Sequence, residues 1–128
     1  MENSIIDLII RIKNGYMAKR ENITSPYSKY KEALLKKLVG LKFVKEYKVE
    51  GEIKKTILIT LIYEKGEPAL TDVVIISRPG RRFYVSYRNL KSIMSGFGHS
   101  ILSTSGGIIT NREARQKKLG GELLFNIW

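Results

Sequence analysis

The chain has 128 residues, a formal net charge of +11 and a hydrophobic content of 43%. This length fits one domain or two small fused half-domains, and the apolar content is enough for a core. The sequence contains no Cys and a single His, His99, which excludes disulfides, thiolate metal sites and iron–sulfur clusters. The basic excess indicates a polyanionic partner, either a nucleic acid or an anionic membrane surface.

The apolar stretches do not predict a membrane-spanning segment. Residues 5–12 are interrupted by Asp7 and Arg11, and residues 57–63 fall short of the roughly 20 apolar residues that a span needs. The acidic Glu2 stands where a secretory signal would carry a basic residue. We therefore expect a soluble intracellular protein that does not enter a membrane.

Two helices and a short strand are predicted first. Residues 4–16 carry one apolar stripe at helical spacing, and residues 23–25 suit a strand. A second helix is predicted over residues 28–39, with Ser28 as its cap and Gly40 ending it. Its expected inward residues are Tyr30, Leu34 and Leu38.

A hairpin and a linker follow. Residues 43–49 and 55–63 alternate as two strands around a turn at Gly51. Residues 64–68 are polar and contain Gly and Pro, which favours a linker. The sequence thus predicts an N-terminal half-domain over residues 1–66 and a C-terminal, RNA-binding half-domain over residues 67–128.

The second half alternates short strands with short helices. Pro79 and Gly80 suit the centre of a type II turn, and a short helix is predicted from a Ser86 cap to Gly96. Thr110 and Glu113 form a capping box that starts a last helix. The strands are expected over residues 73–76, 83–85, 100–102, 108–109 and 123–128. The predicted class is α+β, with two small packed α/β half-domains: helix–strand–helix–hairpin, then mixed strands with short helices.

Catalysis is difficult to build from this sequence. Its carboxylates are few, and no pair of them is spaced for acid–base work. Ser103 and Ser105 lack the Gly-x-Ser-x-Gly context and a base, and Gly106-Gly107 lacks the Lys-Ser/Thr continuation of a phosphate loop. We therefore predict no enzymatic activity, cofactor, metal ion or small-molecule substrate.

Nucleic-acid binding is easier to build, because residues 73–112 contain cations and no carboxylate. Guanidinium groups suit phosphate oxygens, and aromatic rings such as Tyr84 and Tyr87 stack on unpaired bases. Tyr84 alone would equally suit a half-buried strand. The cations are Arg78, Arg81, Arg82, Arg88, Lys91 and Arg112.

The loop over residues 103–107, Ser-Thr-Ser-Gly-Gly, also favours RNA. Its three hydroxyls and backbone N–H groups offer donors and acceptors, and its glycines permit close approach to the shallow minor groove of RNA. The same composition is typical of an ordinary turn, so the loop by itself is weak evidence.

The run from Phe97 to Arg115, FGHSILSTSGGIITNREAR, with Gly-Gly-Glu-Leu over residues 120–123 and Trp128, resembles the bacterial-type family of the eighth protein of the small ribosomal subunit. Residues 77–85, SRPGRRFYV, and residues 6–14, IDLIIRIKN, resemble two other segments of that family. The resemblance covers nearly the whole chain and is densest after Ser77.

The resemblance implies a two-domain α+β protein that binds the central domain of 16S rRNA directly and helps to assemble the 30S platform. Its expected partners are that rRNA and neighbouring small-subunit proteins. Its expected location is the cytoplasmic ribosome, with an organellar ribosome left open.

The resemblance and the charge pattern together give a set of candidate residues. Glu122 is expected to orient the loop rather than to touch phosphate, because a carboxylate facing phosphate is repelled. The family usually has Lys or Arg where Gly106 stands, so one phosphate contact is expected to be missing and the loop more flexible. The candidate RNA contacts are Asn14, Lys29, Lys31, Arg78, Arg81, Arg82, Tyr84, Ser103, Thr104, Ser105, Gly106 and Gly107.

Three alternatives remain open. The first is a translational repressor that binds its own mRNA, the second is an RNA-binding module outside the ribosome, and the third is a membrane-surface or protein adaptor. Co-sedimentation with small subunits would argue against the second, and binding to anionic vesicles without RNA preference would favour the third. The adaptor does not account for the loop over residues 103–107.

Overall fold

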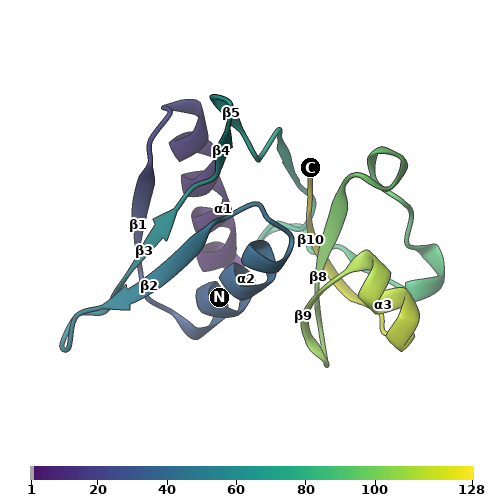
Figure 1. The fold of residues 1–128 in the computed structure, drawn as a ribbon. Helices are drawn as coiled ribbons and strands as arrows, with labels where there is room; N and C mark the ends of the chain where they lie inside the picture. Colours follow the sequence, from purple (N-terminus) through teal and green to yellow (C-terminus); the bar gives the residue numbers. More distant parts are fainter. Residues whose placement is uncertain (1) are drawn as a thin grey trace. The chain divides into compact units, whose positions relative to one another are not determined.

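The computed structural model describes residues 2–128, with the side chains of Glu2, Asn3 and Met94 outside the description (Figure 1). The chain divides into two compact units, Asn3–Leu70 and Thr71–Trp128, four residues beyond the predicted boundary. Each unit combines helix with antiparallel strands, so the predicted α+β class is confirmed.

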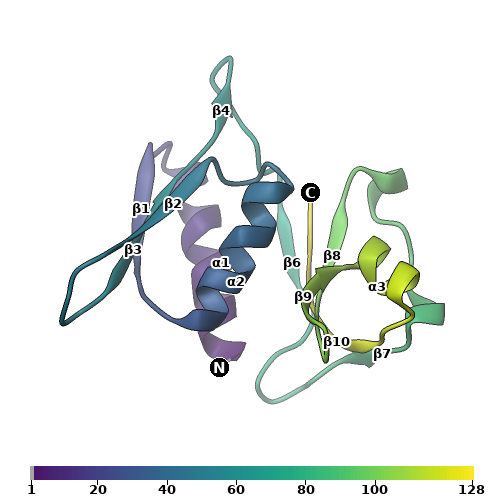
Figure 2. The same cartoon turned by 60° about the horizontal axis from the view of Figure 1, so that its bottom comes forward.

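The first unit places two helices on one face of a three-stranded antiparallel sheet (Figures 1 and 2). The central strand, β3, pairs with β1 on one side and with β2 on the other. The predicted helices, first strand and hairpin are therefore confirmed. In chain order the elements are α1 (Glu2–Met17), β1 (Asn22–Pro26), α2 (Lys29–Gly40), β2 (Glu46–Glu50) and β3 (Thr56–Thr60).

Helix α1 forms because its apolar residues recur on one side and bury together. The buried stripe ends at Tyr16, whose hydroxyl donates to the carbonyl of Phe43 at 2.6 Å and accepts from the N–H of Ile62 at 3.0 Å. These bonds tie α1 to the segments on either side of the hairpin. The stripe consists of Ile5, Leu8, Ile9, Ile12 and Tyr16.

Helix α2 begins at the predicted cap, since the Ser28 side chain accepts from the N–H of Lys31. The prediction that Tyr30 points inward is wrong, because Tyr30 is 46% exposed while Lys31 and Leu35 are buried. The buried stripe centres on residues 31, 34, 35 and 38, which leaves position 30 at its edge. The left-handed residue after the helix is Lys42, with φ 65°, rather than Gly40.

The segment predicted as a linker is instead a small hairpin of the first unit. Strand β4 (Tyr63–Glu64) pairs with β5 (Glu67–Pro68) across a two-residue turn. The turn residues, Lys65 and Gly66, both have positive φ, at 54° and 81°. This conformation matches the twist of a tight hairpin, so the polar turn residues reverse the chain rather than join two domains.

The second unit is built on a five-stranded antiparallel sheet around β10 (Gly121–Ile127). On one side β10 pairs with β8 (His99–Thr104), which pairs with β9 (Gly107–Thr110). The remaining strands, β6 (Val73–Ile75) and β7 (Tyr84–Val85), pair with opposite ends of β10. These are the strands that the sequence predicts.

Helix α3 (Asn111–Lys117) packs against β8 and β9 (Figure 2). Its predicted capping box is confirmed, because Thr110 and Glu113 bond each other's backbone N–H groups. The helix ends at Lys118, with φ 55°, so the predicted end at Gly120-Gly121 is wrong. The core between this helix and the sheet consists of Leu90, Leu102, Ile109 and Ala114.

The helix predicted from Ser86 to Gly96 is wrong. Two short 3-10 segments occupy its place, η1 (Tyr87–Asn89) and η2 (Met94–Gly96). Leu90 between them is extended and enters the core, and the next carbonyl, that of Lys91, accepts from the Asn111 side chain at 3.0 Å. Tertiary contacts therefore replace the bonds that a helix would have made.

Within residues 2–128, no helix is both long enough and apolar enough to cross a membrane.

Candidate nucleic-acid interface

The Ser-Thr-Ser-Gly-Gly segment is the tip of the β8–β9 hairpin rather than a free loop. Ser103 and Thr104 belong to β8, and Gly107 opens β9 opposite Thr104, which leaves Ser105 and Gly106 as the turn. Gly107 has φ 97°, a left-handed conformation that glycine adopts at little cost. The tip is therefore a tight, defined turn.

Thr104 closes this turn from within. Its hydroxyl donates to the carbonyl of Gly107 at 2.9 Å and accepts from the N–H of Gly106 at 3.1 Å. Ser103 and Ser105 are exposed, and their hydroxyls make no side-chain bond within the described chain. Of the three predicted hydroxyl contacts, two are thus available to a ligand and one holds the turn.

Glycines of β10 bring the neighbouring backbone close to this hairpin. A Cβ added at Gly121 would meet the carbonyl oxygen of Ser103 more closely than real Cβ atoms ever come. One added at Gly120 would lie 2.7 Å from the carbonyl oxygen of Val85. The glycine pair therefore allows β7, β10 and β8 to approach one another at the base of the hairpin.

Glu122 joins three of the predicted site residues. In β10 it pairs with Ser103 on one side and with Tyr84 on the other. Its buried carboxylate accepts from the Ser77 hydroxyl at 2.5 Å and from the Arg82 guanidinium at 3.3 Å. The carboxylate thus orients the arginine turn, which refines the role predicted for it at the hairpin.

The arginine turn, residues 77–83, is held by its own backbone and by Ser77. The N–H of Arg81 donates to the carbonyl of Arg78 at 2.9 Å, and Ser77 accepts from the N–H of Phe83 at 3.1 Å. The predicted type II geometry is wrong, because Gly80 does not have the positive φ that this turn requires. Sequence reasoning missed Ser77, since a single buried serine leaves no periodic signal.

A hollow of about 320 Å³ lies against this turn. Its walls are Arg78, Arg81 and Arg82, and its remaining lining is apolar. Arg78 and Arg81 are exposed, so their planar guanidinium donors are available to an anion. Glu122 neutralises part of this charge through Arg82. The arrangement suits phosphate oxygens on the exposed side of the turn.

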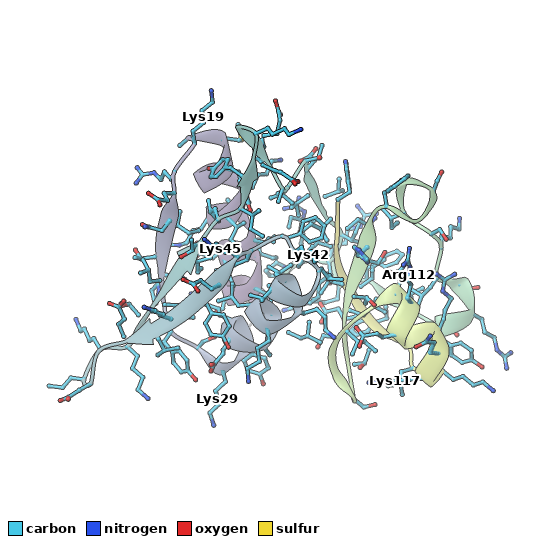
Figure 3. All side chains as sticks on the ribbon, in the orientation of Figure 1. Lys19, Lys29, Lys42, Lys45, Arg112 and Lys117 are labelled. Atoms are coloured by element: carbon cyan, nitrogen blue, oxygen red, sulfur yellow. The ribbon has the colours of Figure 1, made fainter. Side chains whose placement is uncertain are left out.

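The first unit holds the other three predicted contacts. Asn14 and Lys29 are exposed, and Lys29 projects outward from its ribbon in Figure 3. Lys31 is 5% exposed, and its ammonium donates to the Ser25 hydroxyl at 2.9 Å and the Pro26 carbonyl at 3.1 Å. The prediction of Lys31 as a backbone contact is therefore wrong, because its charge is used inside the fold.

Burial explains the titration of Lys31. Desolvation lowers its pKa below the ordinary value, and the charge of Asp7 partly opposes this. A lysine that is desolvated and bonded to neutral oxygens stabilises the junction between β1 and α2.

His99, at the start of β8, gives a prediction for pH dependence. Its pKa is lowered by burial and by the positive charge of Arg112. The unfolded chain therefore binds this proton more tightly, and stability should be complete above about pH 6.5 and fall as the pH drops below it. We expect the urea midpoint to decrease between pH 7.5 and 5.5, and the decrease to be smaller in His99→Thr. Equal decreases in the two proteins would contradict this assignment.

Comparison with known proteins gives one consistent result. Residues 3–128 match the family model described as Ribosomal protein S8. The chain is 42% identical over 125 residues to the small ribosomal subunit protein uS8 of Dictyoglomus thermophilum, covering 97% of this chain and 95% of that protein. It is 43% identical to the protein of the same name from Wigglesworthia glossinidia brevipalpis, with the same coverage.

A third relative, uS8 of Mycoplasmopsis synoviae, is 38% identical over 130 residues, which cover 100% of this chain and 98% of that protein. The chain belongs to the ribosomal protein S8 family. Its role is therefore that of a structural component of a ribonucleoprotein in translation, and the resemblance seen in the sequence is confirmed.

Proposed function

We propose that this protein is a constituent of the small ribosomal subunit that binds the central domain of 16S rRNA directly and helps to assemble the platform. The observation that carries the proposal is the pair of exposed hydroxyls, Ser103 and Ser105, on a hairpin braced by Thr104 and Gly121. Neighbouring small-subunit proteins would be its other partners.

The hairpin suits an irregular RNA stem for a physical reason. Its tip carries small side chains, so the backbone can approach base edges and 2′-hydroxyls that a larger residue would keep away. Because the turn is already fixed by Thr104 and Gly107, little conformational entropy is lost on binding. The arginine turn and Tyr84, joined to the hairpin through Glu122, would contact phosphates and an unpaired base.

Footprinting of the purified protein on small-subunit rRNA tests the proposal. We expect protection confined to one irregular stem of the central domain. Protection of another rRNA domain, or none, would contradict it.

Ser105→Ala is expected to weaken binding to that stem by about 1–3 kcal/mol, because its polar partner on the RNA is left unpaired. Filter binding with the stem transcript measures the change. Ser92→Ala is a suitable control, since Ser92 is an exposed serine of the same unit outside the hairpin. Equal affinities of wild type and Ser105→Ala would remove the hydroxyl from the interface.

Arg81→Ala is expected to act through phosphate charge instead. The slope of log affinity against log salt should become less steep by about one unit, because one fewer counterion is released. The measurement is a salt titration of stem binding between low and moderate ionic strength. Lys65→Ala, an exposed cation of the β4–β5 turn, should leave the slope unchanged.

A further inference from the structure

The second unit contains a groove of about 750 Å³ that the proposed contacts leave unused. It is lined by the segment over residues 83–93 together with side chains of β8 and β10. Its apolar lining comes from Val85, Leu90, Ile93 and Leu123. This size and mixed lining are typical of pockets that hold a small organic group.

Two polar residues of the sheet line the groove. The hydroxyl of Ser100, which is buried, donates to Oδ1 of Asn126 at 2.7 Å. This bond fixes the orientation of the Asn126 carboxamide and uses its oxygen as an acceptor. The NH2 group of Asn126 remains to donate, and within the described chain it has no acceptor. A fixed amide donor in a groove suits the carbonyl or ring nitrogen of a nucleobase.

The other lining residues are aromatic or cationic. Phe83 is 48% exposed and Tyr84 is 69% exposed, and both present ring surface at the groove. Arg88 and Lys91 are exposed, and no carboxylate lines the groove. Aromatic faces stack on bases, and cations without local counter-ions attract phosphate.

We propose that this groove binds one unpaired nucleotide of the RNA, with its base against the aromatic residues and Asn126 and its phosphate toward Arg88 and Lys91. The inference rests on the proposed function and names a second contact for the same RNA. Strand continuity supports it, because Tyr84 pairs with Glu122, which pairs with Ser103 in the hairpin strand. An acidic peptide would use the cations but would leave the Asn126 donor and the stacking surface without a specific role.

The first experiment uses free nucleotides on the full-length protein. Adenosine, guanosine, cytidine and uridine 5′-monophosphates are titrated separately while backbone amide resonances are followed by NMR. We expect shifts in residues 86–91, 100 and 126, larger for at least one nucleotide than for inorganic phosphate. If inorganic phosphate gives the same shifts as every nucleotide, the groove holds an anion only and the proposal is overturned.

Matched variants then separate the base from the phosphate. Asn126→Asp keeps the acceptor for Ser100 but removes the donor, and it should weaken the preferred nucleotide about tenfold. Lys91→Gln, on the surface, should weaken every nucleotide by roughly the same factor. Lys117→Gln, an exposed lysine of α3 outside the groove (Figure 3), should bind like the wild type.

Binding to the rRNA stem distinguishes the two hypotheses. If the wild type binds the stem but Asn126→Asp and Lys91→Gln bind it equally well with the same footprint, the groove is not an RNA contact while the proposed function stands. If the wild type does not bind rRNA, the proposed function itself fails. Displacement of the nucleotide shifts by an aspartate–phenylalanine peptide, with no effect of these variants on RNA affinity, would assign the groove to a protein segment.

Discussion

Replacing Gly121 by Ala is expected to destabilise the second unit by at least about 3 kcal/mol. The added Cβ would overlap the carbonyl oxygen of Ser103, and its next neighbour, the Thr104 methyl, lies at 2.9 Å. A backbone oxygen in a paired strand cannot move aside as a flexible side chain does. The strands β8 and β10 would therefore separate at the base of the hairpin.

Urea unfolding followed by the fluorescence of Trp128, the only tryptophan, measures this effect in the second unit. Gly80→Ala is the matched control in the same unit, because a Cβ there meets nothing within 4 Å and its φ is not positive. We expect the control to change stability by less than about 1 kcal/mol. A Gly121→Ala protein as stable as the control would mean that the strands do not approach this closely.

Glu122→Ala is expected to cost about 3 kcal/mol, because it removes the acceptor of a buried serine hydroxyl and the partner of Arg82. Arg82 is one-third exposed, so its loss is partly offset by water and most of the effect should come from Ser77. Glu122→Gln retains an acceptor and should cost less.

A double-mutant cycle tests this attribution. Ser77→Ala and Glu122→Ala are measured singly and together by urea unfolding, and we expect their effects to be clearly less than additive. Additive effects would show that the 2.5 Å bond between them contributes little. Glu67→Ala, an exposed carboxylate in β5, should change stability only slightly.

Local patterns predicted most elements because those elements depend on neighbouring residues. The stripe of α1, the Ser28 cap and the Thr110–Glu113 capping box all involve residues within a few positions of one another. The segment from Ser86 to Gly96 was predicted wrongly because its conformation depends on partners far along the chain, such as Asn111, which bonds the Lys91 carbonyl.

The candidate interface shows the same difference at the level of single residues. The sequence placed Ser103 and Ser105 in an accessible segment, and the structure exposes them. It gave Lys31 the same role as Lys29, although Ser25 and Pro26 supply an interior site for its ammonium group. Nothing in the sequence around Lys31 distinguishes a buried lysine from an exposed one, because the acceptors belong to another element.

The sequence by itself determined the class of fold, the family, the absence of cysteine chemistry and the acid-free basic region over residues 73–112. These properties follow from composition, from short-range spacing or from one long recognisable run of residues. Tertiary structure alone decided that Thr104 braces the hairpin, that Glu122 holds the arginine turn through Ser77, and that Asn126 lines a groove. Each of these depends on strand register, which brings together residues whose separation in the chain carries no periodic signal.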